Sequence, residues 1–343
     1  MTAAHSAPMT TSNQGDTLST DTAVELFAGP GGMTLGLHAS GIHGTGIEWD
    51  PNAVATRRAA RLPTIHADVR NHEPRDFPGA TVLAGGPPCQ TFTVAGNGTG
   101  RLALTGILAA IKRMAARDTT PYSFEDDRTA LVLEPLRWAL EAIDTGRPYE
   151  LIALEQVQQV QQVWNGYADT LTAEGYHVAT GVVATEQYGV PQTRRRAVLI
   201  ASLHRSVTLP EPTHRPYRKG VPQHEGDPRL LPWVSMGDAL DRPEPFTVVS
   251  NYGTGGDPRN RGRRTSTEPA FTVTGKISRN RIVDASGAEL PRFTAAEAGV
   301  LQGFPADWPW SGNDIAQQVG NACPPALAAA LAHTTRQPLR AAA

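Results

Sequence analysis

The residue best suited to nucleophilic chemistry is Cys89, one of only two cysteines among the 343 residues of the chain. It stands in GGPPCQ, directly after the apolar run TVLA at residues 81–84. Two prolines restrict the backbone before the thiol, and α/β enzymes place reactive groups on loops at the carboxyl ends of parallel strands. A lone cysteine is usually a small packing residue. The glycine–proline loop nevertheless favours a nucleophile that acts as a stabilised thiolate.

The other cysteine, Cys323 in NACPP, is interpreted as a packing residue. Neither cysteine belongs to a CxxC or Cys/His cluster, and the ten histidines form no HExxH or HxH pair. We therefore predict no metal site. Two cysteines also argue against a disulfide framework and favour a reducing, cytoplasmic environment.

A glycine-rich turn, FAGPGG at residues 27–32, lies between an apolar run and a helical pattern. Its glycines allow close backbone approach to a ligand, and the following helix presents free N–H groups. Glu48, at the end of the next strand-like run, is placed to accept hydrogen bonds from ribose hydroxyls. Trp49 offers a flat face to a purine, and Asp68 in HADVR could hold an adenine amino group. An ordinary tight turn is the alternative for the glycines alone; together the residues predict an adenosine-containing cofactor. No GK[ST] follows, which argues against a P-loop enzyme.

Alternating apolar runs and helical patterns must position these residues. Strands are expected at 22–28, 81–84, 150–155 and 197–201, and helices at about 102–116, 127–143 and 160–174. Helical patterns return after residue 292, in TAAEAGVLQGF and ALAAALAHT. This alternation predicts an α/β fold with a doubly wound, mainly parallel sheet.

The amino-acid composition and the periodicity of the sequence change near residue 203. Residues 203–291 are rich in Pro, Gly, Arg and Thr and lack helical periodicity, which predicts a small, loop-rich second domain. The near-duplicates EPFTVVS and EPAFTVTG are expected to form two similar strands within it. The large domain is assigned to 21–202 plus 292–335, and residues 1–20 are expected to be a disordered tail.

The net charge of −2 does not by itself indicate a nucleic-acid partner. Between residues 251 and 292, however, eight Lys/Arg stand against four Asp/Glu. A solvated basic face is the alternative interpretation of this window. No apolar run approaches the length of a membrane span, and the N-terminal segment lacks the pattern of a secretory signal.

The ordered motifs FAGPGG, EWD, GGPPCQ, QTRRR and QVGNACPP resemble those of the DNA (cytosine-5)-methyltransferase family. The resemblance covers about residues 22–202 and 292–332, and the segment between them takes the place of the family's target recognition domain. It implies a Rossmann-like methyltransferase fold, with S-adenosyl-L-methionine as methyl donor and S-adenosyl-L-homocysteine as product. The implied substrate is carbon 5 of a cytosine flipped out of a specific duplex DNA sequence.

The resemblance also implies roles for individual residues. The implied catalytic residues are Cys89, Glu155, Arg194 and Arg196, and the implied cofactor-binding residues are Phe27, Gly29, Gly31, Glu48, Trp49, Asp68, Pro88 and Asn321. Asp127, Arg128 and Leu131 resemble the family's D-R-x-x-L helix, and Gln192 begins its Q-x-R-x-R pattern. One departure is Gln156, which stands where the family usually has Asn after the catalytic Glu. We expect the longer side chain to change how the loop is braced, and so the rate more than the reaction type.

These residue types suit the implied chemistry. A Cys89 thiolate would add to carbon 6 of cytosine, which makes carbon 5 nucleophilic toward a methyl sulfonium. Glu155 would bind N3 and the exocyclic amine, and Arg196 would bind O2. Arg194 would organise the loop and phosphates. A surface charge run is the alternative for Arg194 and Arg196 taken alone. The base that removes the carbon-5 proton is not identified by any residue, and a water molecule can serve.

DNA contacts are expected from the basic window. Arg259, Arg261, Arg263 and Arg264 are predicted to contact phosphates, and Arg279, Asn280 and Arg281 to read base edges. We expect a prokaryotic, cytoplasmic and nucleoid-associated monomer, either acting alone or paired with a separate restriction endonuclease.

Three alternatives remain open on the sequence. One is an RNA (tRNA) cytosine-5 methyltransferase on the same scaffold, against which the 203–291 module argues. The second is a catalytically silent DNA-binding regulator, which the joint presence of Cys89, Glu155 and Arg196 disfavours. The third, a nicotinamide dehydrogenase, leaves GGPPCQ and QTRRR unexplained.

Overall fold

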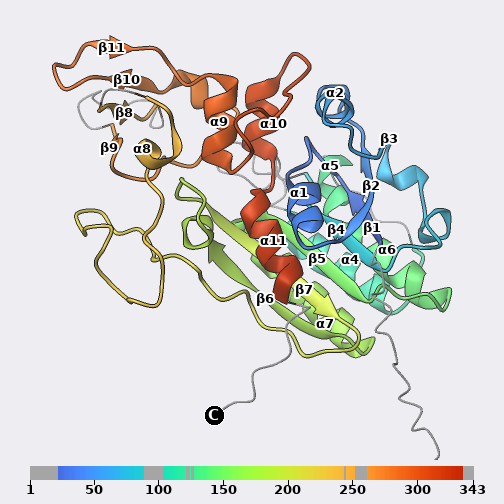
Figure 1. The fold of residues 1–343 in the computed structure, drawn as a ribbon. Helices are drawn as coiled ribbons and strands as arrows, with labels where there is room; N and C mark the ends of the chain where they lie inside the picture. The colour runs from blue at the N-terminus through green and yellow to red at the C-terminus, as the bar shows by residue number, and fades with distance from the viewer. Residues whose placement is uncertain are drawn as a thin grey trace, which may run out of the picture.

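The computed structural model describes residues 22–88, 103–120, 124, 127–242, 245–251 and 261–334. Its larger part surrounds a seven-stranded sheet with the order β3-β2-β1-β4-β5-β7-β6 (Figure 1). The strands are β1 (Thr22–Leu26), β2 (His43–Glu48), β3 (Thr64–His66), β4 (Val82–Gly85), β5 (Leu151–Val157), β6 (His177–Ala184) and β7 (Arg195–Ser202). Strands β1 to β5 pair in parallel, whereas β7 runs antiparallel to both β5 and β6. The predicted fold class is confirmed, although β3 and β6 were not among the expected strands.

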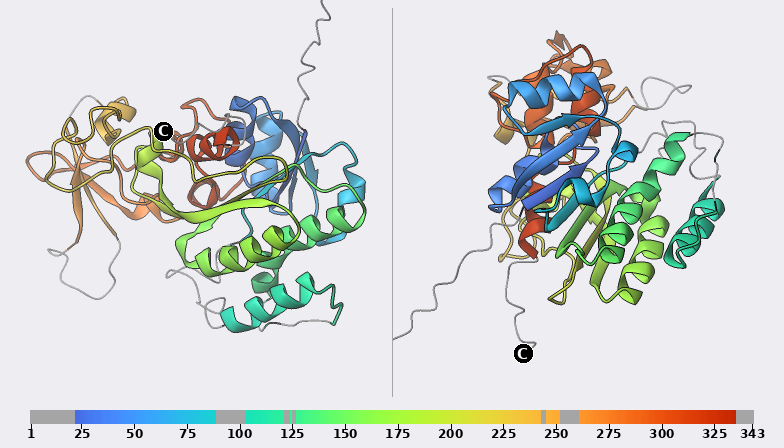
Figure 2. Two further views of the ribbon diagram at one scale, coloured as in Figure 1. Left: turned by 90° about the horizontal axis from the view of Figure 1, so that it is seen from below. Right: turned by 90° about the vertical axis from the view of Figure 1, so that its right-hand side faces the viewer.

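Two helical layers cover this sheet (Figure 2). One layer contains α4 (Leu104–Ala115), α6 (Glu134–Asp144) and α7 (Gln161–Ala173), and the other contains α1 (Gly32–Ala39) and α11 (Pro325–Thr334). Neighbouring strand residues alternate between the layers: Leu83 joins the core beneath the first, and Ala84 the core beneath the second. Both faces of the strands are therefore apolar, as expected for a doubly wound sheet.

The contact between α1 and α11 is unusually close. A Cβ atom added at Gly36 of α1 would lie 2.4 Å from Cβ of Ala328 and 2.5 Å from the backbone nitrogen of Ala329. Glycine is required there because the backbone of α11 occupies the space of a side chain. The helix that follows the glycine-rich turn is thus held by a helix from the far end of the chain.

Helix α4 confirms the expected helix at about residues 102–116. Ile107 and Ile111 enter the core, where α4 packs against α6 and α7. After the helix, Arg117 takes a left-handed backbone conformation, with φ of 57°. Its guanidinium forms ion pairs of 2.7 Å with Asp144 and Glu174. The end of α4 is therefore tied to the chain just beyond α7 and to the last residue of α6.

The expected helix at 127–143 is divided in the structure. Helix α5 (Asp127–Ala130) passes through the 3₁₀ turn η3 (Leu131–Leu133) into α6. Pro135 lies in the first turn of α6, where its missing N–H costs no hydrogen bond. Among the described residues, the other helices are α2 (Pro51–Ala59), α8 (Met236–Ala239), α9 (Ala295–Gln302) and α10 (Ile315–Asn321). The 3₁₀ turns are η1 (Val69–Asn71), η2 (Pro74–Asp76), η4 (Gln158–Val160), η5 (Thr185–Tyr188) and η7 (Ile277–Arg279).

A second sheet has the order β11-β10-β8-β9 and is antiparallel throughout. Its strands are β8 (Thr247–Val249), β9 (Arg263–Thr265), β10 (Arg281–Val283) and β11 (Glu289–Leu290). Strand β8 lies within EPFTVVS as expected. The matching prediction for EPAFTVTG is wrong, because Ala270 instead forms an isolated parallel bridge with Gln192 of the large domain.

The core of the small sheet extends beyond its predicted boundary. Phe246 and Ile282 share one apolar cluster with Leu301 of α9 and Val319 of α10. Helices α9 and α10 therefore pack with the small domain, whereas α11 packs with the large one. The boundary at residue 292 was predicted from the return of helical sequence patterns. Such a pattern predicts a helix but does not show which core the helix packs against.

The expected disordered tail, residues 1–20, lies outside the described residues. In the described part of the chain, no helix combines the length and the apolar character needed to cross a bilayer.

Candidate active site

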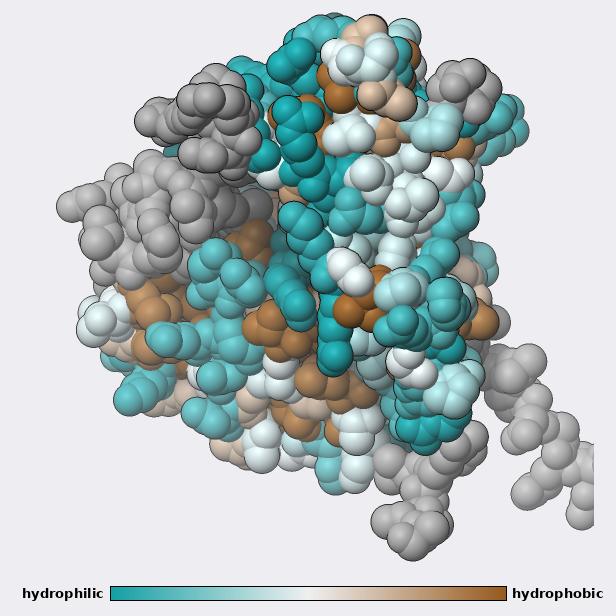
Figure 3. Space-filling model, turned by 90° about the vertical axis from the view of Figure 1, so that its left-hand side faces the viewer, coloured by the Kyte–Doolittle hydropathy of each residue, from teal (hydrophilic) through white to brown (hydrophobic). Residues whose placement is uncertain are grey.

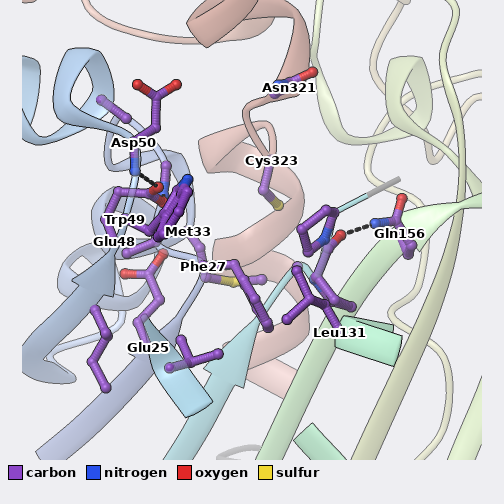
Figure 4. Close-up of a pocket in the computed structure, with 18 of the residues that line it drawn as sticks. Glu25, Phe27, Met33, Glu48, Trp49, Asp50, Leu131, Gln156, Asn321 and Cys323 are labelled. Atoms are coloured by element: carbon purple, nitrogen blue, oxygen red, sulfur yellow. Dashed lines mark hydrogen bonds between the residues drawn. The ribbon is translucent and has the colours of Figure 1, made fainter. Parts of the chain in front are cut away.

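A cavity of about 490 Å³ lies where the strands of the large sheet end. Phe27 follows β1, Glu48 ends β2, Gly86 follows β4, and Glu155 stands near the end of β5. The residues that line it from the predicted set are Phe27, Gly29, Glu48, Trp49, Asp68, Pro88, Asp127, Arg128, Leu131, Glu155, Gln156, Arg194, Arg196 and Asn321. Most of the predicted cofactor-binding residues and three predicted catalytic residues, Glu155, Arg194 and Arg196, thus line one cavity. Figure 4 shows it with Phe27, Glu48, Trp49 and Asn321 labelled. Cys89, which follows Pro88, lies outside the described residues.

The glycine-rich turn is held in an unusual backbone conformation. Phe27 and Gly29 both have left-handed backbones, with φ of 55° and 52°. For a side-chain-bearing residue such as Phe27 this costs on the order of 1–3 kcal/mol, so surrounding contacts must maintain it. The N–H of Ala28 donates to the carbonyl of Ile47 at 3.1 Å, and the N–H of Gly29 donates to Oε2 of Glu48 at 2.7 Å. Strand β2 therefore fixes the shape of the turn.

Gly31 serves packing rather than the cavity. It is absent from the cavity lining, and its φ is 106°. A Cβ atom at this position would lie 2.5 Å from Leu62 and 3.3 Å from Trp308. The next residue, Gly32, lines the cavity, and a Cβ there would overlap the carbonyl oxygen of Cys323 at 2.0 Å. These glycines let two distant segments close around the start of α1.

Glu48 and Trp49 are neighbours in the chain and both line the cavity. Both carboxylate oxygens of Glu48 accept backbone N–H groups, from Asp50 and Gly29, at 2.7 Å. Burial raises the pKa of Glu48, while these two hydrogen bonds lower it. Trp49 is 69% exposed although it lines the cavity, so a large aromatic face is open to a ligand. An acid with further lone pairs beside a free indole suits a ribose and its purine.

Asp68 is oriented by its neighbour Arg70. The Nε and Nη2 atoms of Arg70 donate to the two carboxylate oxygens at 2.6 to 3.1 Å. This hydrogen bonding lowers the pKa of Asp68 and keeps it ionised at neutral pH. An ionised carboxylate only accepts hydrogen bonds, which suits contact with an exocyclic amino group.

Glu155 and Arg196 face each other across β5 and β7. Nε of Arg196 lies 2.6 Å from Oε1 of Glu155, and both residues are buried. The antiparallel register sets Val157 opposite Arg196, which places the guanidinium beside the carboxylate two residues away. Gly86 passes close by, since a Cβ there would lie 3.1 Å from the backbone oxygen of Glu155. The chain leading to Pro88 therefore runs directly against this ion pair.

Gln156 braces that same stretch of chain. Its carboxamide nitrogen donates a hydrogen bond to the carbonyl oxygen of Pro87 (Figure 4). Its carboxamide oxygen accepts the N–H of Val157. The longer residue at this position thus reaches the proline loop and joins it to β5.

Gln192 and Arg194 link the large domain to the small one. Arg194 is buried and donates to the carbonyls of Val273 at 2.8 Å and Gly320 at 2.9 Å. The Gln192 carboxamide donates to the carbonyl of Leu301 at 2.8 Å and accepts the N–H of Val273 at 2.8 Å. The sequence predicted that Arg194 organises the loop and phosphates. Its side chain is only 2% exposed and binds the carbonyls of Val273 and Gly320, which favours a role inside the protein over contact with a phosphate.

Comparison with known proteins agrees with this geometry. The family model described as C-5 cytosine-specific DNA methylase matches residues 22–222. The chain belongs to this family. It is 29% identical to the Type II methyltransferase M1.HphI of Haemophilus parahaemolyticus, over 91% of this chain and 85% of that protein. It is 27% identical to M.NgoMIV of Neisseria gonorrhoeae, over 90% of this chain and 95% of that protein.

Solved structures share the fold at low sequence identity. The Dnmt2 methyltransferase of S. pombe matches with a TM-score of 0.59 and 17% identity, over 90% of this chain and 96% of that one. A DNA modification methyltransferase, described as putative and encoded within an E. coli prophage, matches with a TM-score of 0.57 and 17% identity, over 92% and 98%. At these identities the likeness concerns the arrangement of elements.

For a C-5 cytosine methylase, the second cysteine is poorly suited to attack. Cys323 is buried in the core beneath α1 and α11, as expected for a packing residue. Burial raises the pKa of its thiol well above the ordinary value. Cys323 also lines the cavity, yet a protonated thiol is a weak nucleophile. The assignment of the nucleophile to Cys89 stays a prediction.

The predicted DNA contacts of this methylase differ in their surroundings. Arg263 and Arg279 are exposed, Arg281 is exposed and paired with Glu289 at 2.6 Å, and Arg261 is half-buried. Arg259 lies outside the described residues. Asn280 accepts the N–H of Asn251 at 3.0 Å, so its side chain also supports the small domain. These remain predictions as DNA contacts.

Arg264 is the exception among these arginines, because its guanidinium binds other residues of the small domain. Its guanidinium lies 4.8 Å from the ring centre of Tyr217 and 4.5 Å from that of Phe271. Nη1 donates to the carbonyls of Pro269 and Ala270 at 2.8 Å. Burial lowers the pKa of this guanidinium, although it remains charged at neutral pH. Arg264 therefore holds the small domain together and is not a free phosphate contact.

Two buried charged residues at the cavity were not predicted from the sequence: Glu25, which lines it, and Arg57, which lies behind its wall. Glu25 interrupts the apolar run of β1 and is 4% exposed, and Arg57 of α2 is fully buried. A charge inside an apolar strand was the available signal for Glu25. Arg57 gave none, because it stands beside Arg58 in a helix of ordinary polar character.

Proposed function

We propose that the protein transfers a methyl group from S-adenosyl-L-methionine to carbon 5 of a flipped-out cytosine in a specific duplex DNA sequence. The observation that supports this is the cavity that two groups of side chains share. Phe27, Glu48 and Trp49 suit an adenosine, while Glu155 and Arg196 suit a pyrimidine. A methyl donor and a base bound in one cavity would meet, which the reaction requires.

The residues on the donor side fit the proposed cofactor. Glu48 would accept ribose hydroxyls, Trp49 would stack on the adenine, and Asp68 would accept its amino group. Phe27 and Asn321 would complete the walls. The bound donor supplies an electrophilic methyl group, and S-adenosyl-L-homocysteine is the product.

The remaining chemistry is assigned to the chain's own side chains. The Cys89 thiolate would form a bond to carbon 6, and the electron pair displaced to carbon 5 would then bond to the methyl carbon while the bond from that carbon to the sulfonium sulfur of the donor breaks. Glu155 hydrogen-bonds N3 and the exocyclic amine, and Arg196 contacts O2, which stabilises the charge that develops on the ring. A base, for which water suffices, then removes the proton from carbon 5, and the bond to Cys89 breaks.

The small domain is assigned to DNA recognition. We place the target recognition domain at 203–291, with Arg261, Arg263, Arg279 and Arg281 toward the duplex. A continuous column of hydrophilic side chains descends from the top of the molecule, where this domain lies (Figure 3). Such a surface suits a charged partner better than an apolar one. Relatives named as Type II methyltransferases support pairing with a separately acting restriction endonuclease. We assign a monomer that acts on duplex DNA in the cytoplasm, associated with the nucleoid.

Transfer of labelled methyl groups to duplex DNA and to tRNA tests the substrate. We expect incorporation into duplex DNA, at positions that bisulfite sequencing assigns to one sequence context. Incorporation into tRNA alone would instead establish the RNA methyltransferase alternative.

A covalent trap tests the nucleophile. A duplex containing 5-fluorocytosine retains fluorine where the proton should leave, so the adduct should persist in denaturing gels. We expect it with the wild type and with Cys323→Ser, and its loss in Cys89→Ser. DNA binding without adduct or transfer in the wild type would identify a silent regulator.

A further inference from the structure

Arg57 stands at the centre of a buried network behind the cofactor side of the cavity. It does not line the cavity and has no exposed surface. Nη1 donates to the carbonyl of Ala28 at 3.2 Å and to Oγ1 of Thr34 at 2.9 Å. Nε donates to Oγ1 of Thr64 at 2.9 Å, and Nη2 to the carbonyl of Pro63 at 3.2 Å. One guanidinium therefore ties the glycine-rich turn, α1 and the segment before β3 together.

The network includes a compensating charge. Oε2 of Glu25 lies 3.8 Å from Nη1 of Arg57 and also accepts the hydroxyl of Thr34. Burial raises the pKa of Glu25, and the charge of Arg57 opposes that rise. A buried cation needs such a partner, because an unpaired charge is strongly destabilising in the interior. Gly46 of β2 makes room for the guanidinium of Arg57, because a Cβ atom at this position would overlap Nη2 of Arg57.

Ala28 connects the buried network to the glycine-rich turn. Ala28 lies between Phe27 and Gly29, the two residues with left-handed backbones. Its N–H donates to the carbonyl of Ile47, and its carbonyl accepts from Arg57 and from the N–H of Gly31, so the peptide units before and after Ala28 are both held. A fixed Ala28 maintains the strained conformation of Phe27, whose side chain lines the cavity.

We propose that Arg57 is a positioning residue for cofactor binding, which presets the Phe27–Gly29 turn without touching the ligand. This inference rests on the proposed use of an adenosyl cofactor. Preorganisation lowers the ordering cost of binding, so its loss weakens affinity even when every contact residue is present. The proposal therefore predicts a defect in cofactor affinity, separate from DNA affinity and from the rate at saturating cofactor.

Calorimetric titration with S-adenosyl-L-homocysteine tests the proposal. The variant is Glu25→Gln combined with Arg57→Met, which removes the guanidinium hydrogen bonds and leaves no unpaired buried charge. Because Glu25 also lines the cavity, the Arg57→Lys variant below, which leaves Glu25 unchanged, assigns the effect to Arg57. We expect the dissociation constant to rise about tenfold or more, as for the loss of a buried charged hydrogen-bond network. The affinity for duplex DNA and kcat at saturating cofactor should be retained. Arg58→Met is the matched control, because Arg58 is exposed on the same helix and should leave the affinity unchanged.

A second variant keeps the test decisive if the double variant does not fold. Arg57→Lys retains the charge beside Glu25 but cannot make the forked contacts to Ala28, Thr34 and Thr64. We expect a folded protein with weakened cofactor binding. A folded double variant, or a folded Arg57→Lys, with the wild-type dissociation constant would overturn the proposal. Failure of the wild type to bind the ligand at all would instead reject the proposed cofactor, so the two failures are distinguishable.

Discussion

The side chains of Glu155 and Arg196 form a buried ion pair, with Nε of Arg196 2.6 Å from Oε1 of Glu155. The pair joins β5 to β7 and lines the cavity beside the proline loop. Each side chain holds the other in place, and Nη1 of Arg196 also donates to the carbonyl of Arg195 at 2.7 Å. We expect the second oxygen of Glu155 and Nη2 of Arg196 to contact a base.

Glu155→Gln should lower the rate of methyl transfer at saturating substrates by roughly 10²- to 10⁴-fold, the usual contribution of a positioned acid or base. Gln retains the shape but loses the charge that pairs with Arg196 and the ability to donate as an acid. Single-turnover transfer to a labelled duplex measures the rate, and calorimetry with S-adenosyl-L-homocysteine checks that cofactor binding survives. A rate within a few-fold of the wild type would remove Glu155 from the mechanism.

Gln156→Asn should slow methyl transfer although it restores the residue usual in the family. The shorter carboxamide would no longer reach the carbonyl of Pro87, and an unsatisfied buried polar group costs about 1–3 kcal/mol. We expect a lower melting temperature and a kcat reduced by about tenfold for 1.4 kcal/mol of lost positioning. Cofactor affinity should be unchanged, since Gln156 contacts the proline loop and not the glycine-rich turn. An Asn variant as active as the wild type would show that this brace is dispensable.

Trp49→Ala should weaken cofactor binding with little effect on stability. The side chain is 69% exposed, so its removal leaves no buried cavity. Loss of base stacking costs about 1–3 kcal/mol in comparable sites. Titration of S-adenosyl-L-homocysteine into both proteins measures the difference, and Trp49→Phe should recover most of the affinity. Equal affinities for wild type and Trp49→Ala would exclude adenine stacking on this residue.

Arg263 and Arg264 are neighbours with opposite expected effects. Arg263→Met should weaken duplex binding and reduce the dependence of log affinity on log salt by about one unit, as for one lost phosphate contact. Arg264→Met should leave that slope unchanged and lower the free energy of unfolding by about 1–3 kcal/mol, because buried carbonyls of Pro269 and Ala270 lose their donor. Binding isotherms at several salt concentrations, together with thermal melts, separate the two. The reverse pattern would place Arg264 on the DNA.

Glu186 should make the protein less stable as the pH rises. It is 2% exposed, and within the described residues its Oε2 atom has no hydrogen-bond partner. Burial raises its pKa above the ordinary value of 4.5, so the folded state prefers the protonated acid. The contribution of the protonated acid to the free energy of unfolding is fully present below pH 4.5 and is lost as the pH rises through the raised pKa. The loss is about 1.4 kcal/mol for each unit by which the folded pKa exceeds the unfolded one.

Glu186→Gln should therefore raise the melting temperature at pH 8, and the gain should vanish toward pH 4.5. The exposed Glu225→Gln serves as control and should show no such pH-dependent gain. A Gln variant that melts lower than the wild type at pH 8 would mean that attraction to Arg195 and Arg264 outweighs the cost of burial.

Local signals predicted the parts of the site that lie at strand ends. The turn at Phe27, the acid at Glu48 and the proline loop before Cys89 each combine an apolar run with an immediate change to glycine, proline or acid. Because parallel strands end at the same edge, these local features converge without any knowledge of distant contacts. The ordered motifs then supplied the family, which the residues alone would not have done.

Long-range packing was beyond the sequence. Ala270 was expected in a strand of the small sheet but pairs with Gln192, since its backbone groups find partners in the other domain. Leu301 was assigned to the large domain, whereas its apolar contacts lie in the small one. The partners of Arg57 come from three separate segments, and nothing in its own neighbourhood indicates them. In each case at least one deciding partner is distant in the chain, as Ala28 is from Arg57.

The packing of α11 against α1 has a consequence for the protein while it is being synthesised. Ser40 at the end of α1 contacts Ala329, which is 289 residues further along the chain. During translation, Met33 and Leu37 emerge early, but the helix that covers them is made only after both sheets have been synthesised. The sheet covers part of α1, but the surface that packs against α11 stays exposed until residues 325–334 are made, and a chain truncated before Pro325 would keep that surface exposed.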